Sequence, residues 1–305
     1  MKAVFLETST SEVQKYGDGL RSLKWGEVLS LKYDLPGGSE DLLYERAHEF
    51  KPDLIVYIGT RWGPQPSIVT LSRMTQKIAP TVHICSDAAD MPWWDLLRTY
   101  HDRGVFTLQV AIDGSQKWPL ASSHMTALTP VDASDYTHGD RPHAERTVMC
   151  GYAGNTGGGG TSRRTILLIE FLEKKLIDCR VRSPLPFTYP GYCAYLENCR
   201  ISLNVAYSGT EAALQVKGRV VESALAGACL LETAGAPTSD WFQPGVDYLE
   251  YANSGEAEQI IRRLENEPAE TQAMAQRLRE KVMREHSLEA FWTRIIDRIG
   301  MKRAA

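Results

Sequence analysis

Short, uninterrupted apolar runs recur along the chain and constrain its fold more than any other feature of the sequence. In the first half they lie at 3–6, 54–58, 82–85 and 105–110. Helical patterns lie between them at 40–50, 67–78 and 92–102. An uninterrupted apolar run, unlike strict alternation, is typical of a strand buried on both faces of a parallel sheet. Such strands alternating with helices predict a doubly wound α/β domain.

A polar segment, 129–146, interrupts this alternation. It has two prolines and no apolar period, which is typical of a linker. Strands are expected again at 147–152, 179–181, 201–205, 229–231 and 248–251. Helices are expected at 163–176 and 216–226. We therefore predict a first α/β domain over 1–135, a second over 146–285, and a C-terminal helix over 286–305.

The C-terminal helix carries an apolar stripe. Its members are Leu288, Phe291, Trp292, Ile295, Ile296 and Ile299. This spacing puts them on one helix face, which must be buried against a partner. The stripe fits packing on its own domain, and it also fits a helix that crosses back to the first domain.

Charge and cysteine usage narrow the class of protein. Lys plus Arg number 34 and Asp plus Glu 38, a net charge of −4. This excludes a chain whose whole surface binds nucleic acid, although a local basic groove stays possible. No segment approaches the roughly 18 apolar residues of a membrane span, and the N-terminus lacks a signal-peptide core. The six cysteines are widely spaced without a C-x-x-C pair, so we expect reduced thiols and a cytoplasmic protein.

A glycine-rich segment, GYAGNTGGGGTSRR at 151–164, follows one predicted strand and opens a helix. Glycines allow backbone N–H groups to approach a ligand closely, and a helix N-terminus favours anions. Arg163 and Arg164 in the first turn oppose the helix dipole, which favours an anionic partner. The segment is neither a P-loop nor the G-x-G-x-x-G dinucleotide fingerprint. A plain surface turn is the alternative.

A second motif, VKGRVVESALAGACLL, covers 216–231. Its helix carries Lys217, Arg219 and Glu222 and ends at Gly227 before a strand. Arg219 and Glu222 are three residues apart and share a helix face. From spacing alone, an ordinary ion pair on a solvated surface is the alternative to a binding site.

This helix resembles the donor-binding helix of glycosyltransferases with two facing Rossmann-like domains, the GT-B architecture. The segment WFQPGVDY at 241–248 resembles the stretch that follows in the bacterial spore-maturation-protein-like glycosyltransferases (group 1). KPDLI at 51–55, PVD at 130–132 and EHS at 285–287 are similar to further family positions. The resemblance covers the second half well and the first half loosely. It implies an α/β fold of two facing Rossmann-like domains whose C-terminal helix crosses back to the first.

The resemblance also implies a nucleotide-diphosphate sugar as donor, bound by the second domain. Glu222 matches the glutamate that bonds the ribose hydroxyls. Lys217 and Arg219 would neutralise the diphosphate, with Gly154, Asn155 and Arg163 in the same donor site. Many retaining members carry a glutamate eight residues before the helix glutamate, where this chain has Leu214, with Glu211 off register. We therefore expect an inverting transferase.

An inverting transferase needs a general base near the acceptor hydroxyl. Asp87 follows the strand at 82–85 and is our first candidate; its alternative role is a helix N-cap. Asp18 is the second candidate. It lies in a loop that, in the resembled fold, faces the donor phosphates and the acceptor, and Gly17 in this loop would bind the donor by allowing close backbone approach. The chain has no Asp-x-Asp signature, and Asp135, His138, Asp140 and His143 fit no standard zinc spacing. We therefore expect no metal and no cofactor.

Three other functions remain open. A nucleotide-sugar 2-epimerase shares the fold but needs acid and base carboxylates without an acceptor. A non-catalytic nucleotide-sugar-binding protein would show binding without turnover. A nucleic-acid-base glycosyltransferase is disfavoured only weakly by the net charge. The acceptor, which can be a saccharide, a protein, a small molecule or a nucleic-acid base, and the oligomeric state are not specified by the sequence.

Overall fold

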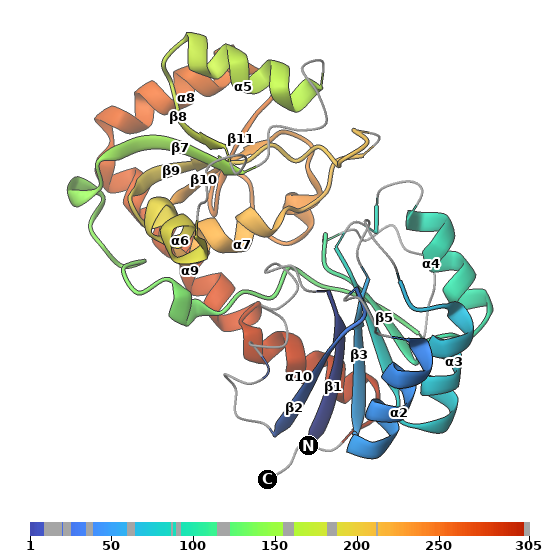
Figure 1. Ribbon diagram of the computed structural model, residues 1–305. Coiled ribbons are helices and arrows are strands. Elements are labelled where there is room, and N and C mark those ends of the chain that lie inside the picture. The colour runs from blue at the N-terminus through green and yellow to red at the C-terminus, as the bar shows by residue number, and fades with distance from the viewer. Residues whose placement is uncertain are drawn as a thin grey trace. The chain divides into compact units, whose positions relative to one another are not determined.

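The protein forms two compact α/β units in a computed structural model (Figure 1). The structure describes residues 1–8, 20, 26–34, 39–59, 65–86, 88–89, 93–114, 123–154, 162–181, 188–211 and 213–301, without the side chains of 93, 94, 180 and 181. The first unit joins Met1–Pro130 to Leu288–Ala305, and the second is Val131–Ser287. The chain thus returns to the first unit at its C-terminus, as the sequence led us to expect.

The first unit contains a parallel sheet. Its strands are β1 (Lys2–Glu7), β2 (Glu27–Lys32), β3 (Leu54–Ile58), β4 (Thr81–Cys85), β5 (Leu108–Ala111) and β6 (His124–Thr126). They lie in the order β2-β1-β3-β4-β5-β6. The apolar runs predicted β1, β3 and β4 to within a residue or two, because these strands are buried on both faces.

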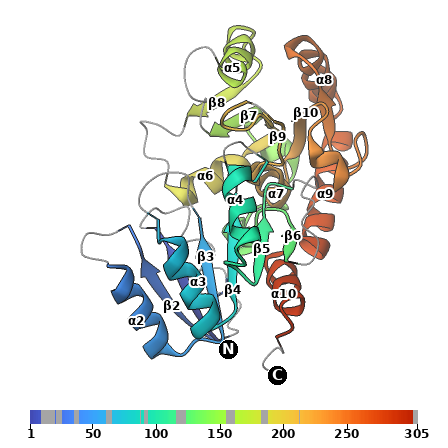
Figure 2. The same cartoon turned by 90° about the vertical axis from the view of Figure 1, so that its right-hand side faces the viewer.

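Helices cover both faces of this sheet (Figures 1 and 2). One face packs on α2 (Glu40–Phe50), α3 (Ile68–Lys77) and α4 (Trp93–Asp102). The other face packs on α10 (Leu288–Arg298), whose apolar stripe enters the core beside β1, β3 and β4. The rings of Phe5 and Trp292 meet edge to face at 5.7 Å between centroids. This burial is why the C-terminal helix belongs to the first unit.

The second unit repeats the scheme. Its strands are β7 (Val148–Gly154), β8 (Asp178–Val181), β9 (Cys199–Leu203), β10 (Cys229–Thr233) and β11 (Leu249–Tyr251). They are parallel in the order β11-β10-β9-β7-β8. Its helices are α5 (Arg163–Glu173), α6 (Tyr189–Glu197), α7 (Gly218–Leu225), α8 (Ser254–Asn266) and α9 (Pro268–Glu285).

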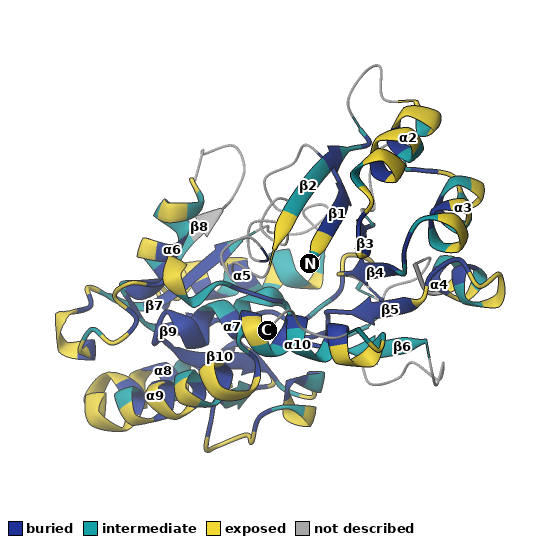
Figure 3. Cartoon of the chain, turned by 90° about the horizontal axis from the view of Figure 1, so that it is seen from below, coloured by how far each residue is buried: buried dark blue, intermediate teal, exposed yellow. Residues whose placement is uncertain are grey.

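The helices of the second unit also lie on two faces of their sheet. α5 and α8 pack with β7, β9, β10 and β11 in one core. α7 lies on the opposite face, where Ser223 Oγ donates to Ser202 Oγ at 2.6 Å. The central strands of both sheets are mostly buried and the edge strands β2, β6 and β11 only partly so, whereas the exposed residues lie mainly on the helices (Figure 3). Both units therefore bury their sheets between helices, as α/β domains do.

The segment predicted as a polar linker is part of the second unit, which begins at Val131, whereas the sequence ended the first domain at 135 and began the second at 146. It forms the 3₁₀-helices η1 (Ala133–Asp135) and η2 (His143–Glu145). Arg146 is buried and donates all of its five N–H groups to carbonyls of Gly139, Arg141, Cys199 and Ala226, at 2.9–3.2 Å. These bonds tie the segment to β9 and to the end of α7, where the helix dipole favours a cation.

Two further expectations bear on the class of protein. Within the described residues, the helices do not include one of the length and apolarity required to span a bilayer. All six cysteines lie in the described part of the chain and are free thiols.

Candidate functional site: the carboxyl edge of the second sheet

The strand order of the second unit places a crevice at a definite edge of its sheet. Because β8 and β9 leave β7 on opposite sides, the order reverses between β7 and β9. Ligands in open α/β sheets bind outside the carboxyl ends of strands at such a switch point. In this unit those ends are Gly154 of β7, Asn204 directly after β9, and Glu232 near the end of β10. The predicted donor residue Gly154 therefore lies where the topology expects a ligand.

Arg219, in the first turn of α7, reaches across this edge. Its Nη1 donates to Asn204 Oδ1 at 3.1 Å, and its Nη2 donates to the carbonyl of Ala153. The guanidinium lies 4.6 Å from the centre of the Tyr152 ring. A guanidinium carries five N–H groups, so these two bonds and the neighbouring Tyr192 hydroxyl do not exhaust its donors.

Gly154 makes room for Arg219. Its φ is 155°, a conformation that side-chain-bearing residues rarely adopt, and a Cβ built there would overlap Nη2 of Arg219. A glycine is therefore needed at this position because the Arg219 side chain approaches its backbone closely. The sequence had suggested an approach by a ligand alone.

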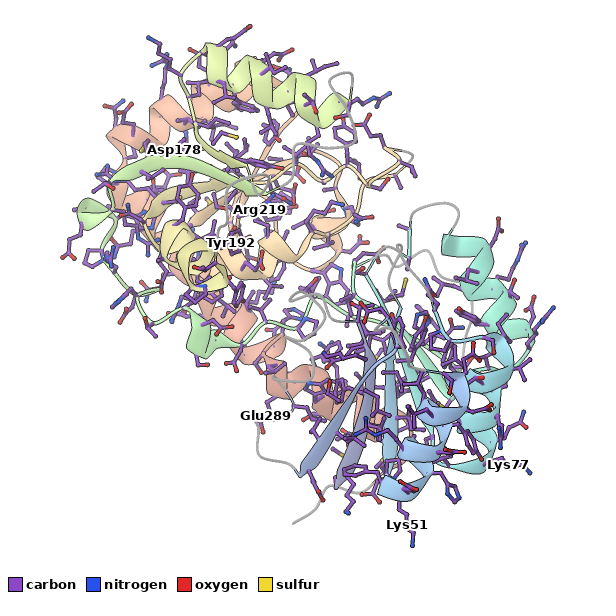
Figure 4. The ribbon with its side chains drawn as sticks, viewed as in Figure 1. Lys51, Lys77, Asp178, Tyr192, Arg219 and Glu289 are labelled. Atoms are coloured by element: carbon purple, nitrogen blue, oxygen red, sulfur yellow. The ribbon has the colours of Figure 1, made fainter. Side chains whose placement is uncertain are left out.

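Glu222 lies one turn further along α7, half-buried. Its Oε2 accepts a hydrogen bond of 2.6 Å from the hydroxyl of Tyr192 on α6. Figure 4 labels Arg219 and Tyr192 in this part of the second unit. Within the described side chains, Glu222 and Arg219 each bond elsewhere, so the simple ion pair that their spacing allowed is not formed. Glu222 keeps acceptor capacity for a further hydroxyl.

The charges at this edge favour an anion. Burial disfavours charge on Arg219, but Tyr152, Tyr192 and Glu222 raise its pKa, and the balance lies above the ordinary value. Lys217 is the N-cap residue of α7 and makes no side-chain cap bond there. The N-terminal N–H groups of a helix attract negative charge. Arg219, Lys217 and the start of α7 together form an electropositive edge.

Arg163 is placed at the start of α5, where its guanidinium lies 5.7 Å from the centre of the Tyr207 ring. The neighbouring Arg164 donates through its side chain to the carbonyl of Tyr207 and through its backbone N–H to Glu211 Oε1, at 3.3 Å. Glu211, whose φ is 61°, thus accepts an N–H from the first turn of α5, beside the N-cap residue Ser162. The carboxylate of Glu211 balances part of the positive charge of Arg163 and Arg164, for which the sequence had suggested only an external anion.

Four predicted site residues, Asp18, Asp87, Gly17 and Asn155, lie outside the described residues. Their roles stay predictions. In the part of the chain that is described, no group of three or more His, Cys, Asp or Glu side chains is arranged to hold a metal ion.

Three residues of this edge were not predicted: Asn204, Glu232 and Tyr192. Asn204 and Glu232 are fully buried, and they join through Asn204 Nδ2 and Glu232 Oε2 at 2.7 Å. A polar residue at the carboxyl end of an apolar strand, as in ISLN and CLLE, was the signal that could have found them. Tyr192 gave no such signal, because its partner Glu222 is 30 residues away.

Comparisons with known proteins bear on the family and the fold. Residues 163–297 match the family model described as glycosyl transferase-like. No curated protein gives a significant sequence match.

Solved structures share the fold across nearly the whole chain. Anabaena HepE in complex with UDP and glucose is 14% identical, covers 97% of this chain and 98% of its own, and has a TM-score of 0.66. A Rickettsia africae glycosyltransferase is 8% identical, with coverages of 98% and 97% and a TM-score of 0.64. An alpha-glucosyltransferase in complex with UDP and a 13-mer DNA is 9% identical, with coverages of 98% and 99% and a TM-score of 0.66. At these identities the likeness establishes the fold.

The two parallel α/β units have the GT-B type of fold, and the match of residues 163–297 to the glycosyl transferase-like family supports a glycosyltransferase. The matched residues 163–297 include α7 with Arg219 and Glu222.

Proposed function

We propose that this protein is a cytoplasmic enzyme that moves a sugar from a nucleotide-diphosphate sugar to an acceptor hydroxyl, with inversion and without a metal ion or cofactor. The second unit, Val131–Ser287, holds the donor, and the first unit supplies the acceptor site. Free cysteines throughout the described chain support a reducing compartment.

The observation that carries the donor assignment is the placement of Arg219. The side chain is held by Asn204 and Ala153 at the switch point of the sheet, and its guanidinium has more N–H donors than these two bonds use. A pyrophosphate bound there would meet Arg219, Lys217 and the N-terminus of α7. Glu222, fixed by Tyr192, would accept hydrogen bonds from the ribose hydroxyls, which suits a carboxylate because it is purely an acceptor.

UDP is the first nucleotide to test. Anabaena HepE has been crystallised with UDP, with UDP and glucose, and with UDP-glucose. Those ligands belong to that protein, but the shared fold makes them the natural probes here. The same likeness extends to an enzyme bound to DNA, so nucleic acid belongs in the acceptor screen.

The proposed chemistry is a single displacement. The acceptor oxygen forms a bond to the anomeric carbon as the bond from that carbon to the diphosphate oxygen breaks. The acceptor proton goes to an aspartate of the first unit, Asp87 or Asp18. The negative charge that develops on the diphosphate is stabilised by Arg219 and Lys217, so the protein's own cations replace a metal. Leu214, at the position where retaining relatives carry a glutamate, supports inversion.

Calorimetric titration with UDP in EDTA tests the donor site. We expect Arg219→Ala to weaken binding roughly 10- to 100-fold, since hydrogen bonds to charged groups contribute about 1.5–3 kcal/mol each. Arg262→Ala is the matched control, because this exposed arginine lies on α8 and pairs there with Glu258. Binding that requires Mg²⁺, or that survives Arg219→Ala unchanged, would overturn the donor assignment.

Turnover tests the reaction. UDP-glucose and other UDP sugars are incubated with saccharide, protein and oligonucleotide acceptors, and the anomeric configuration of the product is read by NMR. Asp87→Asn or Asp18→Asn should abolish transfer while UDP affinity is retained. An epimerised donor without transfer indicates an epimerase instead, and a retained anomeric configuration contradicts the inverting mechanism.

A further inference from the structure

Glu232 is a buried carboxylate that the proposed reaction does not use. It lies near the carboxyl end of β10 and has no exposed surface. Its Oε1 accepts from the backbone N–H of Thr233 at 2.7 Å. Its Oε2 accepts from Asn204 Nδ2 at 2.7 Å and from the hydroxyl of Thr238 at 3.1 Å. A fully buried ionisable group is costly unless its bonds are satisfied, so its presence calls for a role.

Asn204 stands between this carboxylate and Arg219. Its backbone is fixed, because its N–H donates to the carbonyl of Leu231 and its own carbonyl accepts from the hydroxyl of Tyr251, both at 2.8 Å. The buried side-chain amide can therefore change partners only by rotating. Its NH₂ end faces Glu232 and its oxygen faces Arg219.

The orientation of that amide is set by the chemistry of its neighbours. An ionised carboxylate only accepts hydrogen bonds and a guanidinium only donates them. With Glu232 on one side and Arg219 on the other, a single orientation of Asn204 satisfies both. The reverse orientation would place oxygen against oxygen and N–H against N–H.

We propose that Glu232 is a positioning residue: it orients the Asn204 amide and thereby holds the Arg219 guanidinium toward the donor diphosphate. This inference rests on the proposed function of Arg219. Glu232 touches no substrate and acts entirely through Asn204.

The charges around Glu232 fix the pH of the test. Burial raises its pKa to about 7, against the lowering effect of its three hydrogen bonds and of Arg219 on α7. From β11 and the turn before it, Tyr248 and Tyr251 face the carboxylate, and Glu250 is its register partner on β11. At pH 8 the carboxylate is mainly ionised, so there it accepts from Asn204 and fixes the orientation of the amide.

The first variant is Glu232→Gln, which keeps the size of the side chain. If the new amide turns its oxygen to Thr233 N–H, its NH₂ meets Asn204 Nδ2, and Asn204 must rotate and turn its NH₂ toward Arg219. If the new amide turns the other way, its NH₂ opposes the Thr233 N–H, which cannot move. We expect UDP affinity at pH 8 to fall roughly five- to tenfold, less than on removal of Arg219, because Arg219 loses its bond to Asn204 but keeps its bond to the carbonyl of Ala153.

The second variant restores the pattern of hydrogen-bond donors and acceptors, and it moves the negative charge from position 232 to position 204. In the double variant Asn204→Asp with Glu232→Gln, the new aspartate accepts both from the new amide at position 232, which it faces, and from Arg219. The net charge equals that of the wild type. We expect UDP affinity to return to within roughly threefold of the wild-type value. Rescue of this kind separates orientation of Arg219 from mere loss of stability.

Two controls complete the design. Glu250→Gln removes a carboxylate at the paired position on β11, where Glu250 bonds the Tyr248 hydroxyl, and should leave UDP affinity unchanged. In an Arg219→Ala background, Glu232→Gln should cause no further loss of affinity, because its effect passes through Arg219.

The outcomes distinguish the two proposals. If the wild type does not bind UDP or any other nucleoside diphosphate, the proposed function fails and takes this inference with it. If the wild type binds and Arg219→Ala weakens binding, but Glu232→Gln binds normally or the double variant shows no rescue, only the positioning role is overturned. If Glu232→Gln is too unstable to titrate, the double variant alone decides, since the positioning role requires it to bind UDP like the wild type.

Discussion

Replacing Gly154 by alanine should disable the donor site while leaving the fold intact. Two separate costs arise. The φ of 155° lies in a region open almost only to glycine, where another residue costs about 1–3 kcal/mol. The added Cβ would also overlap Nη2 of Arg219 and approach the Tyr152 hydroxyl at 3.4 Å. The guanidinium must then leave the carbonyl of Ala153 and the amide of Asn204.

The loss of Arg219 from its place sets the magnitude. Each of these two bonds has a charged donor and contributes about 1.5–3 kcal/mol, and a displaced guanidinium no longer meets the diphosphate. We expect UDP to bind roughly 10- to 100-fold more weakly, which corresponds to about 1.4–2.8 kcal/mol. The assay is calorimetric titration with UDP, beside a thermal melt of each variant.

Gly235→Ala is the matched control for the backbone cost. Gly235 has a φ of 76°, and a Cβ built on it meets no atom within 4 Å. It should therefore lower stability by about 1–2 kcal/mol through strain alone and leave UDP affinity unchanged. A folded Gly154→Ala protein that binds UDP as tightly as the wild type would refute the reasoning, because Arg219 would then not need the space.

Three predictions concern stability. Burial lowers the pKa of His83 to about 4, below its unfolded value near 6.5. The contribution of the neutral imidazole to stability is therefore complete above pH 6.5 and is lost as the pH falls toward 4, by up to about 3.4 kcal/mol. Urea unfolding across this range should show a smaller loss of stability in His83→Phe than in the wild type. Arg146→Met leaves the carbonyls of four residues unpaired and should lower the free energy of unfolding by about 3 kcal/mol or more, whereas a drop below about 1 kcal/mol would mean that water replaces the guanidinium. Trp292→Ala should cost about 3–5 kcal/mol, measured by the melting of the first unit, because the indole is fully buried against Phe5.

Most of the strands could be predicted because central strands of a parallel sheet are apolar on both faces. β2, Glu27–Lys32, was missed because it is an edge strand in which only Leu31 is buried, and its EVLSLK sequence contains no continuous apolar run. α6 was missed because YPG at 189–191 reads as a turn, whereas the proline occupies the first turn of a helix, where it is tolerated. β5 begins at Leu108, later than predicted, since Val105 and Phe106 are buried before the strand starts.

The polar composition of the segment at 129–146 led to an incorrect prediction of its structure. Buried polar residues such as Arg146 and His143 are satisfied by backbone carbonyls, for example His143 Nε2 and the carbonyl of Gly227 at 2.9 Å. Carbonyl groups carry no sequence signature, so the segment was predicted as a linker although it is packed in the second unit.

The candidate site was predictable in part. Glu222, Arg219 and Lys217 lie within one short helix, so their spacing and the family resemblance reveal them together. Asn204 and Glu232 come from β9 and β10, and whether they meet depends on strand order and register, which a single sequence does not specify. The site residues in the loops, Asp18 and Asp87 among them, rest on the sequence alone.

The buried Glu232 has an energetic consequence opposite in sign to that of His83. Its pKa of about 7 exceeds the ordinary value of 4.5, so the ionised carboxylate lowers stability above pH 7, and this penalty vanishes as the pH falls through 7 toward 4.5. The full difference is about 3.4 kcal/mol. The neutral amide of the Glu232→Gln variant has no such proton linkage.

The unfolding free energy of the wild type relative to Glu232→Gln should therefore rise by about 2.5 kcal/mol between pH 8 and pH 5, whereas Glu250→Gln should show no comparable trend. Urea unfolding at these two pH values measures it. A constant difference would mean that Glu232 keeps an ordinary pKa. If the difference does change, the second unit tolerates a carboxylate that costs it stability at neutral pH, which makes sense for a residue retained to orient Arg219.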